Sequence, residues 1–144
     1  MIRRQLRSLR RDKSGSTIVE FAILAPVIIA MIVGVIQVGT SMQSYNAMRS
    51  IASDTARYAV IEYQKKNEVT DSALETYAEN IAQGAPYLLQ SSFDATVTAV
   101  ATPRVNGTFE KTLVVTYTPP SFMPIIPITP PQLKFTRSIF VIDE

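Results

Sequence analysis

The sequence predicts an α+β protein with a long N-terminal helix, a second short helix and a small antiparallel β-sheet of about three strands. Three observations predict this class. A run without charged side chains extends from Phe21 to Ile36. Helical periodicity then continues with polar residues interspersed, and the last third is rich in threonine, valine and aromatic residues in alternating order. A chain of 144 residues accommodates one membrane helix and one small domain, but not two sizeable cores.

The first predicted element is a transmembrane helix at residues 16–40. The apolar stretch from Ile18 to Val38 is long enough to cross a hydrocarbon core of about 30 Å at a rise of about 1.5 Å per residue. The small residues that a signal peptidase requires are poorly placed around Gly34 to Met42, which disfavours a cleaved secretory signal.

Residues 1–15 form a basic leader, with six of the chain's 14 basic residues and one of its 12 acidic residues. A positive flank stays in the cytoplasm, which places residues 41–144 on the far side of the membrane as an extracytoplasmic domain. From Ser16 onward the chain carries 8 basic and 11 acidic residues, a net charge of −3. No nucleic-acid partner is therefore expected, although the whole chain has a net charge of +2.

A stripe of small residues runs along the apolar helix at every fourth position: Ala22, Pro26, Ala30 and Gly34. Such a stripe lets other helices pack closely, although an alanine-rich segment also produces it by chance. Pro26 removes a backbone donor, which a membrane helix tolerates when neighbouring helices or local adjustment satisfy the freed carbonyl.

Beyond the bilayer the helix is predicted to continue in amphipathic form to about Gln64. Its apolar stripe is expected to pack the domain core: Met42, Tyr45, Met48, Ala52, Ala56, Ala59 and Tyr63. Asp54 and Arg57 are spaced for an ion pair on the helix surface.

One more helix and three strands are predicted to complete the domain. Thr70 or Asp71 can cap the helix, and Gly84 ends it. Asn106 and Gly107 form a turn signal between the first two strands. The strands are predicted at three ranges: 96–101, 109–118 and 132–142.

Residues 119–131 form a connection that holds six of the nine prolines. This density excludes a helix or a central strand and favours extended backbone. The apolar residues between the prolines are expected either to fold back on the domain or to contact a neighbouring subunit or the membrane surface.

The chain has no histidine and no cysteine, so nucleophile arrangements that depend on them, disulfides and the commonest metal ligands are excluded. Glu75 and Glu79 lie one turn apart and are assigned to a solvated helix face rather than to an acid/base pair. We therefore predict no catalytic residues, no metal site and no cofactor. A membrane-anchored hydrolase is disfavoured, because the sequence shows no convincing set of acid/base residues for it.

Glu20 is a lone carboxylate at the start of the apolar run, five residues after Gly15. An ionised carboxylate deep in a bilayer costs about 3 kcal/mol and marks a functional position. Glu20 therefore needs a partner.

The order of leader, glycine, carboxylate and apolar run resembles the class III signal of type IV pilins, and the wider segment resembles the TadE-like family of tight-adherence pilus proteins. The matching residues fall within the first 60: Gly15, Val19, Glu20, Phe21, Ala22, Leu24, Pro26, Gly34, Ala52, Ala56, Arg57 and Tyr58. The resemblance implies a pilin-like fold and cleavage after Gly15 by a prepilin peptidase. It also implies that Glu20 meets the new α-amine, on Ser16, of a neighbouring subunit and so sets subunit register. Many type IV pilins begin with phenylalanine, so N-methylation of Ser16 is not assigned.

The resemblance further implies a minor pilin or pseudopilin of a tight-adherence (type IVc) pilus that contributes to assembly, surface attachment and biofilm formation. Expected partners are the prepilin peptidase, other pilin or pseudopilin subunits and the tight-adherence assembly platform. The expected location is the inner membrane, single-pass with a cytoplasmic N-terminus, and after assembly a surface pilus. The alternative is a signal-anchored extracytoplasmic binding domain with no pilus role, for which Gly15 and Glu20 have no use.

Overall fold

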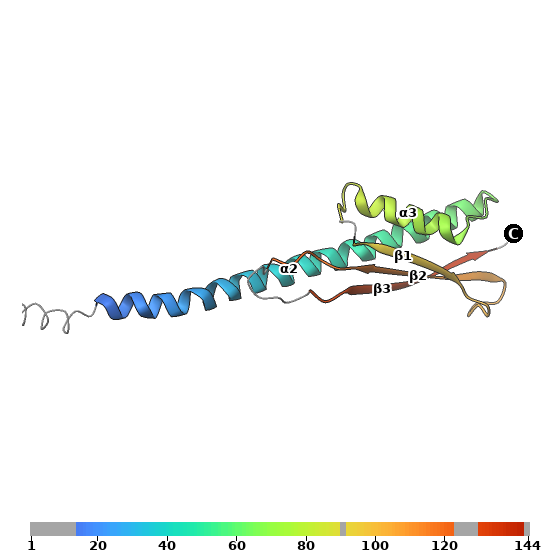
Figure 1. Ribbon diagram of the computed structural model, residues 1–144. Helices are drawn as coiled ribbons and strands as arrows, with labels where there is room; N and C mark the ends of the chain where they lie inside the picture. The colour runs from blue at the N-terminus through green and yellow to red at the C-terminus, as the bar shows by residue number, and fades with distance from the viewer. Residues whose placement is uncertain (1–13, 90–91, 123–129, 143–144) are drawn as a thin grey trace, which may run out of the picture.

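The computed structural model describes residues 14–89, 92–122 and 130–142 (Figure 1). The predicted α+β class is confirmed, with a long N-terminal helix, a second short helix and a three-stranded antiparallel sheet. The elements follow one another in this order: α2 (Ser14–Gln64), α3 (Asp71–Gln83), β1 (Asp94–Ala99), β2 (Thr108–Tyr117) and β3 (Leu133–Ile142).

Helix α2 is the stem of the molecule. Its 51 residues extend for about 77 Å at a rise of about 1.5 Å per residue. The N-terminal half projects away from the rest of the chain, whereas the C-terminal half lies along the sheet (Figure 1). The helix continues through Pro26 and ends at Gln64, where the amphipathic pattern predicted its end.

The sheet has the order β1-β2-β3, and both helices cover the same face of it. Helix α2 packs mainly along β3, and α3 packs along β1. Register places Thr96, Val114 and Thr136 side by side on the opposite face, which no helix of the described chain covers. The domain is thus a two-layer structure with one solvated sheet face, which is common for antiparallel sheets.

The core forms where the C-terminal half of α2 meets α3 and the sheet. The largest fully buried side chains come from all three parts: Met48, Ile51, Thr55, Leu74, Leu113, Val115, Ile139 and Val141. The rings of Tyr58 and Tyr77 stack at a centroid distance of 4.0 Å and join the two helices. Of the predicted stripe, Met48, Ala52, Ala56 and Ala59 are buried, but Met42 is 65% exposed because it lies nearer the free half of the stem.

Helix α3 is capped as predicted and also protects an edge of the sheet. Thr70 is the N-cap, and its hydroxyl accepts a hydrogen bond from the backbone N–H of Ala73. The backbone N–H of Val97, on edge strand β1, donates to Oε1 of Glu75 over 2.7 Å. The assignment of Glu75 to a purely solvated face is therefore wrong, because α3 packs close enough to β1 for this carboxylate to cap the strand edge.

A buried cation connects the sheet to the start of α3 and to the segment before it. The Lys111 Nζ donates to Oδ1 of Asp71 over 2.7 Å and to the carbonyl of Val69 over 3.2 Å, and it lies 5.6 Å from the ring centroid of Tyr63. Burial opposes the charge of Lys111, but Asp71 and Tyr63 outweigh burial and raise its pKa above the usual value.

Two further sequence-based expectations need correction. The predicted ion pair between Asp54 and Arg57 is not formed within the described chain, because Oδ2 of Asp54 accepts a hydrogen bond from the Tyr87 hydroxyl over 2.8 Å instead. The first strand starts at Asp94 rather than at residue 96, since its ladder with β2 begins with Asp94 opposite Thr116. The turn signal is confirmed at Gly107, which has a φ of 78° and so favours glycine.

We expect Glu75→Ala to lower the free energy of unfolding by about 1–2 kcal/mol, because it leaves the Val97 N–H on an open strand edge without its charged acceptor. Glu79→Ala, one turn further along α3, is the matched control and should change stability by less than about 0.5 kcal/mol. Urea unfolding of the detergent-solubilised chain and amide exchange at Val97 measure the two effects. Equal stability and equal Val97 exchange in both variants would contradict the capping role.

Candidate functional site

The predicted signal motif lies at the free end of α2. The helix begins at Ser14, so Gly15, Ser16 and Glu20 are all helical. The Ser16 hydroxyl donates a hydrogen bond to Oε1 of Glu20 over 3.1 Å, one helical turn away. Both side chains are exposed, and this end of α2 projects away from the domain (Figure 1). Within the described chain Glu20 is thus a carboxylate on an apolar helix whose donor is a neutral hydroxyl, so its charge is not cancelled.

The apolar half of α2 is covered by nothing in the described part of the chain. Its large side chains are mostly exposed: Ile18, Val19, Phe21, Ile23, Leu24, Val27, Ile28, Ile29, Met31, Ile32, Val35 and Ile36. A core helix of a soluble protein would be buried, and soluble monomers rarely expose such a large apolar surface. Helix α2 is long and apolar enough to cross a membrane, and it fits a single-pass membrane anchor.

The predicted small-residue stripe lies on this uncovered half. Ala22 and Pro26 are exposed, and Ala30 and Gly34 are half-buried. The structure therefore brings Ser16 and Glu20 together, but it places no other described segment against the stripe. Its role in helix packing stays a prediction.

Hydroxyl residues follow the apolar run, and their donors are satisfied inside the helix. The hydroxyls of Thr40, Ser41 and Ser44 donate to the carbonyls of Ile36, Gln37 and Thr40 over 3.0, 2.8 and 2.9 Å. Such bonds remove unpaired hydroxyl donors from the helix surface. The first turns after the apolar run are therefore suited to the low-dielectric edge of a bilayer.

Gln37 joins the stem to the proline-rich connection. Its Nε2 donates to the carbonyl of Pro120 over 3.1 Å, and its Oε1 accepts from the backbone N–H of Phe122 over 3.0 Å. We call this pair of hydrogen bonds the Gln37 clamp. Sequence reasoning missed it, and the available signal was a single amide, the first polar side chain after Glu20. Residues 123–129 of the connection lie outside the described residues.

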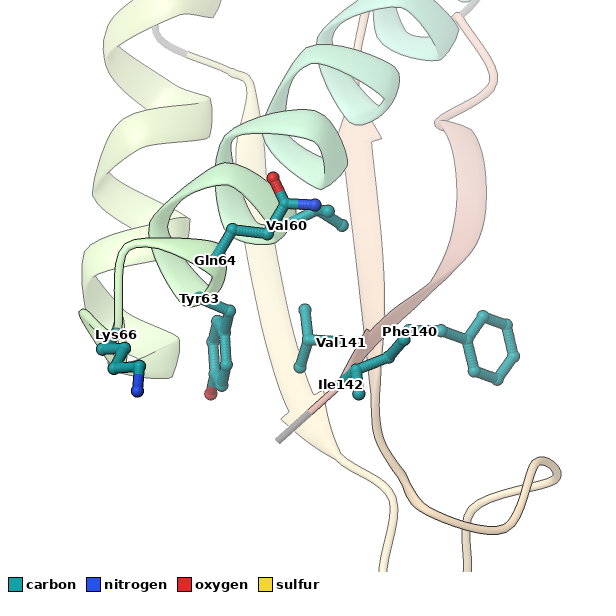
Figure 2. A pocket seen from close by; sticks show the side chains of 7 residues that line it. All are labelled: Val60, Tyr63, Gln64, Lys66, Phe140, Val141 and Ile142. Carbon is teal, nitrogen blue, oxygen red and sulfur yellow. The ribbon is translucent and has the colours of Figure 1, made fainter. Parts of the chain in front are cut away.

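A separate hollow lies at the end of the domain where α2 and β3 finish (Figure 2). Its lining comes from both elements and from the residues after α2: Val60, Tyr63, Gln64, Lys66, Phe140, Val141 and Ile142. Tyr63 and Lys66 are its ionisable groups, and the ring of Phe140 points away from them (Figure 2). The described residues include no group of three or more His, Cys, Asp or Glu side chains placed to hold a metal ion. The hollow therefore offers neither a carboxylate pair nor a ligand set.

Comparison with known proteins gives a family match that lies within α2. Residues 15–57 match the family model described as TadE-like protein. No curated protein and no solved structure matches the chain. The match starts at Gly15 and ends at Arg57, so it covers the free half of α2 and part of the half that packs on the sheet. The resemblance predicted from the leader, glycine and carboxylate is confirmed: over residues 15–57 this chain is similar to the TadE-like, pilus-associated proteins.

Proposed function

We propose that this chain is a minor pilin or pseudopilin of a tight-adherence (type IVc) pilus, and that α2 is its assembly element. The observation that carries the proposal is the uncovered apolar half of α2, which holds a lone carboxylate at Glu20 and lies within the TadE-like match. Such a helix suits two environments in turn. It lies in the bilayer before assembly and among the helices of other subunits afterwards.

Cleavage after Gly15 by a prepilin peptidase is the first step of this function. It would remove the basic leader and leave a mature chain of net charge −3 that begins at Ser16. The leader would by then have oriented the helix, with residues 16–40 in the membrane and residues 41–144 outside the cytoplasm. The position of Gly15 as the first residue of the family match supports this site.

Glu20 sets subunit register in this proposal. In the intact chain Glu20 accepts a hydrogen bond from the Ser16 hydroxyl, which is neutral and so does not compensate the charge of a carboxylate. Cleavage would add a positively charged α-amine at Ser16, and the amine of one subunit can then pair with Glu20 of its neighbour. An unpaired carboxylate in hydrocarbon costs about 3 kcal/mol, so helices packed out of register are disfavoured.

The small-residue stripe would face a neighbouring helix in the assembled pilus. Ala22, Pro26, Ala30 and Gly34 allow close backbone approach on one side of α2. Pro26 has no N–H, so the carbonyl of Ala22 loses its intrahelical partner and can accept a hydrogen bond from a neighbour.

The domain and the location complete the proposal. Before assembly the chain would reside in the inner membrane. The tight-adherence assembly platform would then incorporate it into a surface pilus that serves attachment and biofilm formation. Its partners are other pilin or pseudopilin subunits, and its function requires no cofactor. A signal-anchored binding domain, the alternative, would use α2 only as a tether and would keep its leader.

Mass spectrometry of the protein from cells with and without their prepilin peptidase tests the processing step. We expect a chain that begins at Ser16 when the peptidase is present and an uncleaved chain that retains residues 1–15 when it is absent. An N-terminus that is the same in both strains would contradict the pilin function and support the tether.

Incorporation of Glu20 variants tests the register step. Glu20→Ala should enter the inner membrane at least as well as the wild type, because it removes a charge from the span, while its amount in sheared pili falls several-fold. Ser16→Ala is the matched control, since it removes the hydroxyl that donates to Glu20 but keeps the α-amine. We expect it to be incorporated normally. Normal incorporation of Glu20→Ala, or an equal loss of both variants, would overturn the charge-pair account.

A further inference from the structure

We propose that Phe122, held in place by the Gln37 clamp, enters the boundary between lipid headgroups and acyl chains of the membrane that α2 crosses. The domain would then contact the bilayer at a second point, beside its stem. This inference rests on α2 spanning a bilayer, as in the proposed function. It needs neither cleavage after Gly15 nor assembly into a pilus.

The clamp fixes the position of Phe122 along the stem. Gln37 is the first polar side chain after Glu20, and the 21 residues from Ser16 to Ile36 cover a hydrocarbon core of about 30 Å. Two hydrogen bonds of 3.1 and 3.0 Å hold the backbone of the proline-rich connection at this level. The side chain of Phe122 is 44% exposed there and so is open to lipid. Phenylalanine, like tryptophan and leucine, is among the side chains that membrane-surface segments bury at the boundary between headgroups and acyl chains.

Several polar backbone groups at the clamp are paired or missing. Pro119 and Pro120 have no N–H to satisfy. The carbonyl of Pro120 and the N–H of Phe122 bond to Gln37, whose amide gains one donor and one acceptor partner in return. An unpaired amide group next to hydrocarbon costs several kcal/mol, so this pairing removes a large obstacle to insertion.

The segments that meet at the clamp carry no charge. Helix α2 has no charged residue from Phe21 to Met48, and the chain has none from Thr112 to Leu133. The uncharged part of the stem thus continues for about 18 Å past Ile36, so the headgroup region next to the clamp meets no charged side chain of α2. The charged residues of the domain lie outside these two stretches. Insertion of Phe122 into the membrane therefore does not require a charged side chain to enter the lipid.

A groove beside the clamp extends the uncharged surface that these segments form. Its volume is about 410 Å³, and its lining contains no charged side chain: Gln37, Val38, Ser41, Met42, Tyr45, Asn46, Pro131 and Leu133. Val38 is 61% exposed at this level. Lipid is the occupant that the position favours, because this surface lies at the membrane edge whenever α2 spans a bilayer, whether or not another subunit is present.

Tryptophan fluorescence tests the proposal, because the chain has no tryptophan of its own. The full chain, one copy per lipid nanodisc, would carry Phe122→Trp, and lipids brominated on their acyl chains near the headgroup would serve as quenchers. Phe21→Trp, inside the apolar run, is the positive control. Phe109→Trp is the matched negative control, since Phe109 is similarly exposed at 48% but lies on β2 opposite Val141, at the far end of the domain.

We expect bromine to quench Phe122→Trp several-fold more than Phe109→Trp, in neutral and anionic lipids alike because the surface is uncharged. Quenching no stronger than that of Phe109→Trp would overturn the proposal, and if Phe122→Trp were then shielded from aqueous acrylamide, protein would be its occupant. An unquenched Phe21→Trp would remove the membrane-spanning premise and the proposal with it. These outcomes are separate from the peptidase test, which reads only the N-terminus.

A second pair of variants tests the clamp. In the Phe122→Trp background, Gln37→Ala should reduce the quenching towards the level of Phe109→Trp, because the backbone of residues 120 and 122 loses its attachment to the stem. Gln43→Ala removes an exposed amide from the same helix and should leave the quenching unchanged. Equal quenching in both variants would show that the clamp does not position Phe122.

Discussion

The apolar half of α2 must be covered by something other than the described part of its own chain, and the architecture depends on this constraint. The domain packs only on the C-terminal half of the helix, where small residues such as Ala52 and Ala59 let α3 and the sheet approach closely. The other half remains a single helix with its large side chains exposed. A membrane and a bundle of similar helices are the two surroundings that satisfy such a surface.

Several contacts attach the domain to the end of the stem that is far from Glu20. Lys111 connects β2 to Val69, between the helices, and to Asp71, at the start of α3, while Glu75 joins α3 to the edge of β1. At the other end of the sheet, Gln37 attaches the proline-rich connection to α2. The domain is therefore fixed along the stem from residue 37 onward, and the half below it is free for lipid or for other helices.

Local patterns were sufficient to predict most of the fold. The end of α2 near Gln64, the Thr70 cap and the turn at Gly107 each depend on residues that are close in sequence. The resemblance to the TadE-like family was recognised for the same reason, since Gly15, Ser16 and Glu20, which contribute to it, lie within two turns of one helix. The packing role of the stripe could not be tested, because it needs a second helix. Contacts between distant segments were missed: 83 residues separate Gln37 from Pro120, and 33 separate Asp54 from Tyr87.

The central claim is that other pilus helices cover the apolar half of α2 on its small-residue side. The chain has no cysteine, so a single cysteine can be placed at Ala30 or, on the opposite side of the helix, at Ile32. Each would be labelled with a short thiol-reactive photo-crosslinker in assembled pili, and the crosslinked partners would be identified by mass spectrometry. The account predicts crosslinks from Ala30→Cys to the N-terminal helix of another pilin subunit, at several-fold higher yield than from Ile32→Cys. Crosslinks to lipid alone from both positions would contradict it.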